Sequence, residues 1–424
     1  MRWRLRALPA LGAGLRAPST APGRASEDGL SGTGGTAPAP DRHRPSPGRG
    51  RGDTVRAWTE LFRVSALFSV PGDALAGAAA VGRGPGRGTA LAIGASLCLY
   101  EAGMALNDWA DREEDAVDRP HRPIPSGRIS PPAALGAAGV LTAAGLALAA
   151  RAGRPALAVA TGLAATVWAY DLHLKHTKAG PAAMAAARSL DLLLGATATA
   201  TATAGAGASA SAGRGPGPGP RTARPVHGGA AAPDNVAAPP RPALGALAAA
   251  LPAALVLGAH TYGVTAVSRH EAQGGSTAVP LAVLATTTAL GAAVLTADRA
   301  ARTRAPGPGA GGLGVTVAGL GTSGLGATGP RERRAIRPHH APALTFLLLT
   351  AFTGAYLRTA GPPLLHAALN PSPPLTQRAV GGGIRAMIPL QAALATRAGA
   401  PGSGLAVIAL VPLARALARK VSPT

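Results

Sequence analysis

The chain is poor in cysteine, lysine, aromatic residues and charge of either sign. Its 424 residues contain one cysteine, Cys98, which lies inside an apolar run. An intrachain disulfide framework and a zinc site of several thiolates are therefore excluded. Lysine occurs only at Lys175, Lys178 and Lys420, so arginine supplies most of the net charge of +22. The arginines lie in connectors between apolar runs and not on a compact basic domain, which argues against a nucleic-acid partner.

Charged residues make up only 14% of the chain, whereas hydrophobic residues make up 47%. The hydrophobic residues are concentrated in long runs of alanine, leucine, valine and glycine. This pattern predicts an all-α bundle of transmembrane helices with the lipid bilayer as its surroundings. Abundant glycine and alanine favour close helix packing in lipid. We expect a multi-pass protein of the cell membrane.

The apolar runs predict about nine transmembrane helices. They cover residues 58–81, 89–106, 132–150, 155–170, 182–204, 242–267, 278–297, 342–357 and 380–418. The last run is interrupted by Gly399-Ala-Pro-Gly402, so it is either one broken span or two, and ten is the alternative count.

The polar segments divide the chain further. Residues 1–54 are rich in arginine, proline, glycine and serine and are expected to form a disordered basic tail. Residues 55–420 are expected to form the membrane domain. Two inserts at 205–241 and 299–340, rich in glycine, proline and arginine, interrupt it and are expected to be flexible loops.

An acidic segment, residues 107–128, follows directly on the second apolar run. On a helix, Asp108, Asp111, Asp115 and Asp118 would lie at i, i+3, i+7 and i+10, on one face roughly 80° wide at ~3.6 residues per turn. Four such carboxylates repel one another unless a cation joins them. Carboxylate oxygens suit Mg²⁺, whose coordination is usually completed by water and substrate phosphates.

Two further polar clusters follow later spans. Residues 170–178, Tyr-Asp-Leu-His-Leu-Lys-His-Thr-Lys, offer either diphosphate-binding lysines or an ordinary flank of a membrane helix. Arg269 and Glu271 close the sixth predicted span and by themselves are typical of a solvated helix end. Because loops after even-numbered spans share one side of the membrane, the acidic segment, the Lys175 loop and the Arg269 loop are expected on one face.

Four ionisable residues fall inside predicted spans: Asp73, Glu101, Arg188 and Asp191. Such residues are costly in lipid and normally face a cavity or a partner. Arg188 and Asp191, at i and i+3, are expected to pair with each other. Glu101 lies seven residues before Asp108, so it could extend the polar stripe into the membrane.

Two motifs in this chain occur together in a known family. They are Asn107-Asp108-x-x-Asp111-x-x-x-Asp115 followed by Arg122-Pro123-x-Pro125-Ser126-Gly127, and Tyr170-x-x-x-Leu174-Lys175. The first resembles the first aspartate-rich motif of the UbiA superfamily of intramembrane prenyltransferases, and the second resembles that family's Y-x-x-x-L-K element. The resemblance implies a bundle of nine helices in which two aspartate-rich loops bind Mg²⁺ and a polyprenyl diphosphate. It also implies transfer of the prenyl group to an aromatic or other acceptor.

The second aspartate-rich motif of that family is not intact in this chain. After the sixth predicted span the sequence reads Ser268-Arg-His-Glu-Ala272, in which Glu271 is the only carboxylate. Tyr262-Gly-Val-Thr265 with Arg269-x-Glu271-Ala272 resembles the EboC-type branch, whose reaction is less certain. One metal instead of two would follow, unless Arg269 replaces the second cation by binding the diphosphate bidentately.

The resemblance assigns a role to each candidate residue. Asp108, Asp111 and Asp115 would hold Mg²⁺ on the diphosphate and act in catalysis with Lys175, which would neutralise the departing diphosphate. The remaining substrate-binding residues would be Asn107, Arg122, Tyr170, Arg269 and Glu271.

Two other classes of function remain possible for this sequence. A non-catalytic isoprenoid-binding or trafficking protein of the EboC type would need the cavity and one metal, and the incomplete second motif favours it. A transporter would show glycine- or proline-broken helices in matching halves of the chain, and no convincing pair is present.

Overall fold

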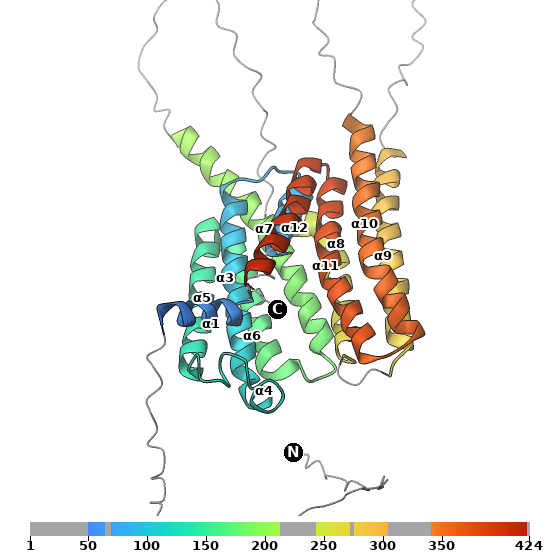
Figure 1. Cartoon of the computed structure of the whole chain (residues 1–424). Helices are drawn as coiled ribbons and strands as arrows, with labels where there is room; N and C mark the ends of the chain where they lie inside the picture. Colours follow the sequence, from blue (N-terminus) through green and yellow to red (C-terminus); the bar gives the residue numbers. More distant parts are fainter. Residues whose placement is uncertain (1–49, 64–68, 213–242, 272–274, 304–340, 422–424) are drawn as a thin grey trace, which may run out of the picture. The chain divides into compact units, whose positions relative to one another are not determined.

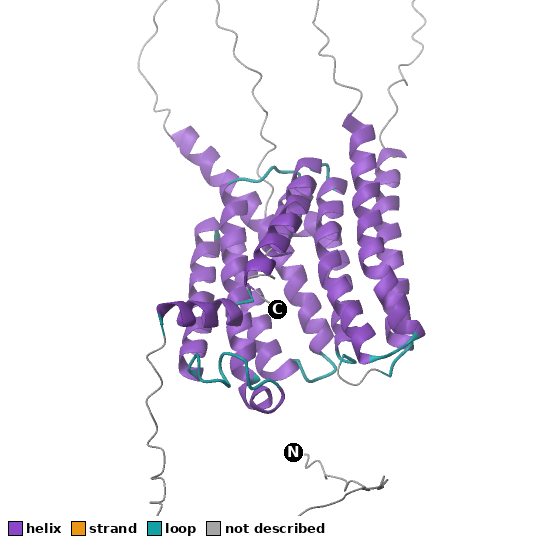
Figure 2. Ribbon diagram, viewed as in Figure 1, coloured by secondary structure: helices purple, strands orange, loops and turns teal. Residues whose placement is uncertain are grey.

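The computed structural model describes residues 50–63, 69–212, 243–271, 275–303 and 341–421. The chain divides into two units, residues 1–48 and 49–424, and all described residues belong to the second. Within the described residues every regular element is a helix, as Figure 2 shows, which confirms the predicted all-α class. The predicted tail lies outside the described residues as far as residue 49, and a helix begins at Arg51.

The helices are, in chain order, α1 (Arg51–Leu61), α2 (Val70–Ala80), α3 (Arg87–Ala110), α4 (Arg112–Asp118), α5 (Pro131–Ala152), α6 (Arg154–Ala169), the π-helical η2 (Tyr170–Leu174), α7 (Gly180–Ala212), α8 (Ala243–Ser268), α9 (Ala278–Thr303), α10 (Ala341–Leu369), α11 (Pro373–Arg397) and α12 (Pro401–Val421). Figure 1 shows the long helices running side by side as a bundle, with α1 lying across them.

Six of the described helices are long and apolar enough to cross a membrane, so the protein is a multi-pass membrane protein. They are α3, α5, α6 with η2, α8, α9 and α10. The helices α7 and α11 are also long, at 33 and 25 residues, but they are not among these candidate spans. Both are surrounded by other helices, since α7 packs on α2, α3, α6 and α8, and α11 packs on α2, α8, α10 and α12. A helix surrounded by protein needs less apolar surface than one facing lipid.

The first and last predicted spans are divided differently from the prediction. In place of a single helix over 58–81, α1 ends at Leu61 and α2 has only 11 residues. At ~1.5 Å per residue, α2 covers roughly half of a ~30 Å hydrocarbon core. The last region forms two helices, α11 and α12, because Gly399 adopts a φ of 86° and ends the first of them. The interruption at Gly399 therefore separates two helices instead of bending one.

Three helices continue beyond their predicted ends. The helix α7 extends to Ala212 and α9 to Thr303, into the two segments expected to be loops. Alanine has the highest helix propensity of all residues, and the first of these extensions is rich in it. The helix α10 continues through Pro362 and Pro363 to Leu369. Proline is tolerated inside a membrane helix where neighbouring groups satisfy the freed carbonyls. The rest of each insert lies outside the described residues.

Four connections lie at the same end of the bundle: α3 to α5 with α4, η2 to α7, α8 to α9, and α10 to α11 (Figure 1). Contacts between them agree with this placement, since Gly275 N donates a hydrogen bond to Pro371 O at 2.9 Å. The end of α7 and the start of α8 lie at the opposite end, as do the end of α9 and the start of α10. The shared face expected for the acidic, Lys175 and Arg269 loops is therefore confirmed.

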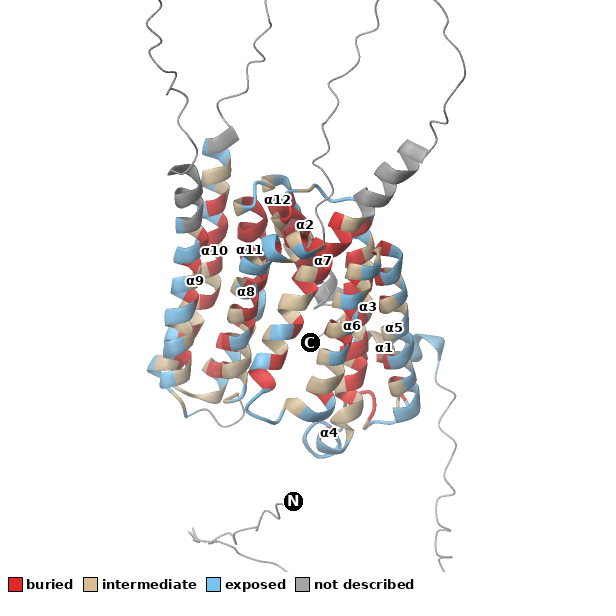
Figure 3. Ribbon diagram, turned by 180° about the vertical axis from the view of Figure 1, so that it is seen from behind, coloured by how far each residue is buried: buried red, intermediate tan, exposed pale blue. Residues whose placement is uncertain are grey.

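A buried polar cluster joins α2, α3, α7 and α11 within the bundle. Arg188 Nη1 lies 3.1 Å from Asp73 Oδ2, and Gln391 Nε2 donates to Asp73 Oδ1 at 2.7 Å. The i,i+3 spacing had suggested an ion pair between Arg188 and Asp191. Instead, Arg188 forms its ion pair with Asp73 of α2, and Asp191 accepts a hydrogen bond from Ser96. Figure 3 shows buried residues concentrated on the inward sides of the helices. The expected pair was wrong because the spacing within one helix carries no information on charges that another helix supplies.

Candidate functional site

Two carboxylates of the acidic segment, Asp108 and Asp115, are buried at the end of the bundle where the four connections lie. A single guanidinium joins them: Arg122 Nη1 lies 3.3 Å from Asp108 Oδ1 and 2.6 Å from Asp115 Oδ2. Arg63 Nη2, from the residues after α1, reaches Asp108 Oδ1 at 2.9 Å. Burying two like charges side by side requires such compensation.

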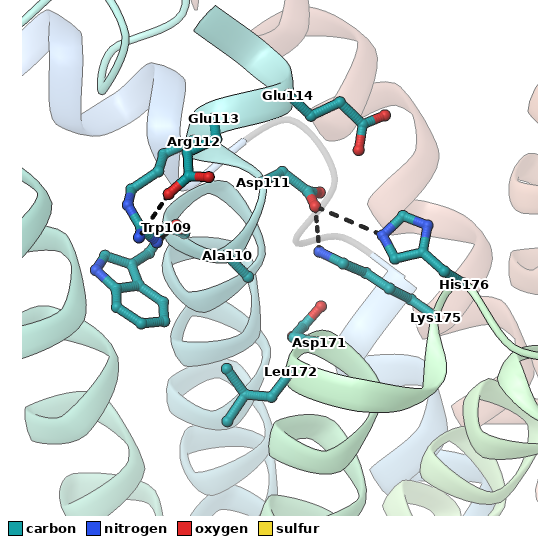
Figure 4. Close-up of a pocket in the computed structure, with 10 residues that line it drawn as sticks. All are labelled: Trp109, Ala110, Asp111, Arg112, Glu113, Glu114, Asp171, Leu172, Lys175 and His176. Carbon is teal, nitrogen blue, oxygen red and sulfur yellow. Dashed lines mark hydrogen bonds and ion pairs between the residues drawn. The ribbon is translucent and has the colours of Figure 1, made fainter. Parts of the chain in front are cut away.

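The third carboxylate, Asp111, faces a different partner. The helix α3 ends at Ala110 and α4 begins at Arg112, so Asp111 occupies the junction with φ −88° and ψ 3°. The continuous helical stripe expected for the aspartates is therefore interrupted, although Asp115 N still donates to Asp111 O at 2.8 Å. Asp111 forms an ion pair with Lys175 Nζ, and His176 Nε2 lies 4.0 Å away (Figure 4). The fourth member of the stripe, Asp118, is exposed.

The Arg-Pro-x-Pro-Ser-Gly sequence forms the turn that places Arg122. Ser126 Oγ donates to Arg122 O at 2.6 Å, and Gly127 has a φ of 68°, which glycine adopts without a steric cost. Arg128 fixes this turn to α1 through two hydrogen bonds to Glu60, at 2.6 and 3.0 Å. The hydrogen bonds from Arg128 to Glu60 raise the pKa of Arg128 above its ordinary value.

The Lys175 side of the site is built on η2. A π-helical turn is rare and is found mostly at functional sites. It places Tyr170 half-buried at its start and Asp171 buried beside α3, where Asn107 Nδ2 donates to Asp171 Oδ1 at 3.1 Å. Asn107 therefore orients a carboxylate, and that carboxylate comes from the Tyr170–Lys178 segment and not from the acidic segment.

The α8–α9 connection contributes Arg269 and Glu271. The Arg269 guanidinium donates to the carbonyl of Thr177, which places it against the loop that carries Lys175. Glu271 is half-buried, and burial raises the pKa of its carboxyl while the charge of Arg119 lowers it. Arg119 also reaches Asp115, at 3.4 Å. Arg269 and Glu271 thus both lie near the loops that carry the other predicted residues.

An open cavity of ≈ 340 Å³ lies between the end of α3 and η2. Its lining residues, drawn in Figure 4, are Trp109, Ala110, Asp111, Arg112, Glu113, Glu114, Asp171, Leu172, Lys175 and His176. Arg112 stacks over the Trp109 ring at 4.7 Å and points away from Asp111. The cavity is therefore lined by the carboxylates Asp111, Glu113 and Glu114 on the α3–α4 side, and by Asp171 with Lys175 and His176 on the η2 side.

The donor atoms of this cavity fit a divalent cation. Ligand atoms of Asp111, Glu114 and His176 all lie within 4.8 Å of one another. Two carboxylates and an imidazole suit a small divalent ion, and carboxylate oxygens suit Mg²⁺ in particular. Asp108 and Asp115 are two further carboxylates of the acidic segment, and both are held by arginine.

The sequence pattern did not single out four residues that the structure places here: Arg63, Glu114, Asp171 and His176. Glu114 and Asp171 lie inside the very segments that were recognised, so their carboxyl groups were available as a signal. His176 follows Lys175 directly. Arg63 lies 45 residues from its partner Asp108, in a segment predicted to span the membrane, and no spacing rule connects the two.

Comparison with known proteins gives the family. The model of the UbiA prenyltransferase family matches residues 69–326, more than half of the chain. A digeranylgeranylglyceryl phosphate synthase of Methanopyrus kandleri is 38% identical over 128 residues, which are 29% of this chain and 45% of that protein. The chloroplast chlorophyll synthase of Arabidopsis thaliana is 46% identical over 52 residues, 12% of this chain and 13% of that protein. The matched segments thus span less than half the length of these curated relatives.

Among solved structures, a UbiA homolog from Archaeoglobus fulgidus bound to GPP and Mg²⁺ is similar at 15% identity. The alignment covers 83% of this chain and 99% of that one, with a TM-score of 0.46. The family match itself rests on the sequence, and it includes α3, α4 and η2, from which most of the site is built. The chain belongs to the UbiA prenyltransferase family.

Proposed function

We propose that the protein transfers a prenyl group from a polyprenyl diphosphate to an acceptor within the cell membrane. The observation that carries the proposal is the juxtaposition, at one end of a membrane bundle, of three aspartates with Arg63, Arg122 and Lys175. A divalent cation needs carboxylates, and a diphosphate needs cationic side chains within a few ångströms of them. The aspartates of this site supply the first, and the arginines and Lys175 supply the second.

Asp111 and Glu114, with Asp108 and Asp115, are the residues that would hold Mg²⁺. When bound, the ion would neutralise the diphosphate oxygens and stabilise the charge that grows on them as the leaving group departs. His176, whose Nε2 lies 4.0 Å from Asp111 Oδ1, would be a further ligand at this position.

The chain's own cations act on the same charge. Lys175 and Arg122 each lie against an aspartate, so both are held at the site before any substrate arrives. As the bond between C1 of the prenyl group and the diphosphate oxygen breaks, both electrons leave with the diphosphate. Donors that are already in place stabilise that charge without reorganisation. Arg269, tethered to Thr177, approaches from the α8–α9 connection and replaces the cation that a second acidic motif would bind.

The acceptor is a protic group carried by a membrane molecule. Archaeal relatives are named for a glyceryl phosphate that carries two geranylgeranyl groups. We therefore place a prenylated glyceryl phosphate beside aromatic compounds among the acceptors to be tested.

The experiment measures diphosphate release and diphosphate binding with purified protein, prenyl diphosphates of several lengths, Mg²⁺ and this set of acceptors. Wild type should release diphosphate only with Mg²⁺ and an acceptor present. Asp111→Asn should weaken Mg²⁺-dependent diphosphate binding by about tenfold or more, about 1.4 kcal/mol. Asp53→Asn, which changes an exposed aspartate in the first turn of α1, is the matched control and should behave as wild type. Diphosphate binding that is unaffected by chelator or by Asp111→Asn would remove the metal from the proposal.

The alternative is a non-catalytic isoprenoid-binding protein of the EboC type, and the replacement of the second acidic motif by Arg269 favours it. Arg269→Ala should abolish release of diphosphate if this residue acts as the second cation, and Arg269→Lys should retain part of it because the charge is kept. Tight diphosphate binding by wild type, without release for any acceptor, would decide for the binding protein.

A further inference from the structure

Glu101 is an acidic residue inside a membrane-crossing helix, and the site described above does not use it. It lies on α3, within the candidate span Arg87–Ala110. Both of its carboxylate oxygens are shielded from solvent, and neither has a hydrogen-bond partner in the structure. Buried polar side chains nearly always have such partners, so each exception calls for an explanation.

The other buried charges of the bundle do have partners. Asp73 faces Arg188 and Gln391, and Asp191 accepts a hydrogen bond from Ser96. Glu101 is therefore not a member of the polar cluster that links α2, α7 and α11. A carboxylate in lipid without a partner is costly, and residues of this kind usually face a substrate path.

The position of Glu101 relative to the diphosphate site is informative. It precedes Asp108 by seven residues, so it lies on nearly the same face of α3 and ~10 Å deeper in the membrane at ~1.5 Å per residue. A near-attack contact of about 3–3.5 Å to the acceptor atom and a base contact of about 2.6–3.2 Å together fit within this length. The nucleophilic atom of an acceptor therefore fits between the diphosphate end and Glu101.

We propose that Glu101 is a catalytic residue that binds the acceptor's protic group and takes its proton during prenyl transfer. This inference rests on the proposed function. The bond between C1 and the diphosphate oxygen breaks, and the electron pair leaves with the diphosphate. The acceptor atom forms the new bond to C1 with its own electron pair. Its proton moves to a Glu101 carboxylate oxygen, which balances the charge at the acceptor.

The same geometry defines the class of acceptor. A carboxylate accepts a hydrogen bond from a hydroxyl, a phenol or a neutral amine, and it repels an anion. Any phosphate on the acceptor must therefore lie away from Glu101, toward the arginines and lysine at the end of the bundle. The reacting group itself is a neutral protic group that enters from the membrane side of the diphosphate.

The test compares wild type, Glu101→Gln and Glu101→Asp in the diphosphate-release assay, with binding of the prenyl diphosphate measured separately. Glu101→Gln keeps the size of the side chain but cannot accept the proton. We expect it to lower kcat by about 10²- to 10⁴-fold, the usual contribution of a general base, and to leave the affinity for the prenyl diphosphate and Mg²⁺ unchanged. Glu101→Asp should recover part of the rate. Asp53→Asn should match wild type.

A fall in kcat without a fall in donor affinity separates a catalytic role from a structural one, since misfolding would reduce both. Turnover by Glu101→Gln within twofold of wild type would overturn the inference and leave the proposed function standing. An equal loss of donor binding and turnover in Glu101→Gln would also overturn it, in favour of a structural carboxylate. If wild type releases no diphosphate with any acceptor, both proposals fall together.

Discussion

At the scale of single residues, Arg122 can bind either the buried carboxylates of the site or the diphosphate of the substrate. Its guanidinium bridges Asp108 and Asp115, and the carboxylates that it neutralises are the ones a divalent cation would bind. Arginine also binds phosphate oxygens in a bidentate manner. The same side chain therefore keeps two buried carboxylates from repelling each other and is available to the diphosphate once a metal ion replaces it.

This double role predicts opposite effects on two affinities. Arg122→Ala should raise the affinity for Mg²⁺ alone, because the carboxylates lose a competing cation. It should lower the affinity for the prenyl diphosphate by about tenfold, about 1.4 kcal/mol, because a phosphate contact is lost. Calorimetric titration of the variant with each ligand measures both. A fall in both affinities would show that Arg122 mainly maintains the fold of the turn.

The residue pattern shows how far the sequence alone could identify the site. The spacing of Asp108, Asp111 and Asp115, and the polar segment at Lys175, were sufficient to place carboxylates and a cation at one end of the bundle. Arg63 could not be identified, because its partner Asp108 lies on another helix 45 residues away. The carboxyl group of Asp171 was visible in a recognised segment, but its contact with Asn107 of α3 was not. A contact between distant segments depends on packing, and single-sequence periodicity does not contain it.

At the scale of helices, small residues determine how closely two elements approach. A Cβ atom on Gly195 of α7 would lie 2.4 Å from Ala74 Cα of α2, and one on Gly77 would lie 2.2 Å from Leu192 O. The two helices are therefore in backbone contact, which is typical of glycine-mediated packing in membranes. The close contact between α2 and α7 brings Asp73 of α2 within ion-pair distance of Arg188 of α7.

The close approach of α2 and α7 gives a prediction for Gly195→Leu. The larger side chain would push the helices apart and destabilise the bundle by about 1–3 kcal/mol, the usual cost of overpacking. Thermal unfolding in detergent measures the loss. Gly139→Leu is the matched control, because a Cβ at Gly139 on α5 has nothing within 4 Å. Equal stability of the two variants would contradict this account of the α2–α7 contact.

Helix ends were predicted less well than helix existence, for identifiable reasons. The eighth predicted span ended at Leu357, but α10 continues through Pro362 and Pro363 to Leu369. The apolar run at 58–81 suggested one helix, although Arg63, with a φ of 46°, lies after the end of α1. Side-chain hydropathy indicates where a helix is buried, whereas its ends depend on backbone geometry.

At the scale of the whole molecule, most of the first insert lies outside the described residues, because the description stops at residue 212 and resumes at residue 243. The helices on either side of this gap are described. The helix α7 ends at Ala212 and α8 begins at Ala243, both at the end of the bundle opposite the site. The described ends of this connection therefore lie away from the site.

Deleting residues 213–240 should leave folding and diphosphate binding unchanged. Each halving of a flexible loop changes its closure entropy by only about 0.6 kcal/mol. Because Arg241 and Pro242 alone would remain between α7 and α8, the glycine- and alanine-rich end of α7 is expected to unwind and complete the connection. Thermal stability and Mg²⁺-dependent diphosphate binding of the deletion variant are the measurements. A loss of binding at unchanged stability would show that the insert takes part in the site, contrary to this topology.

All four site connections lie at one end of the bundle, so the site can be reached by water-soluble ions from only one side of the membrane. In proteoliposomes, molecules inserted in one orientation expose their aspartates to the external buffer, and those in the other orientation expose them to the lumen. A chelator that does not cross the bilayer should then abolish the activity only of the molecules whose aspartates face the external buffer. The protected remainder should become sensitive when the vesicles are made permeable, so residual activity reports the orientation of the protein in the membrane.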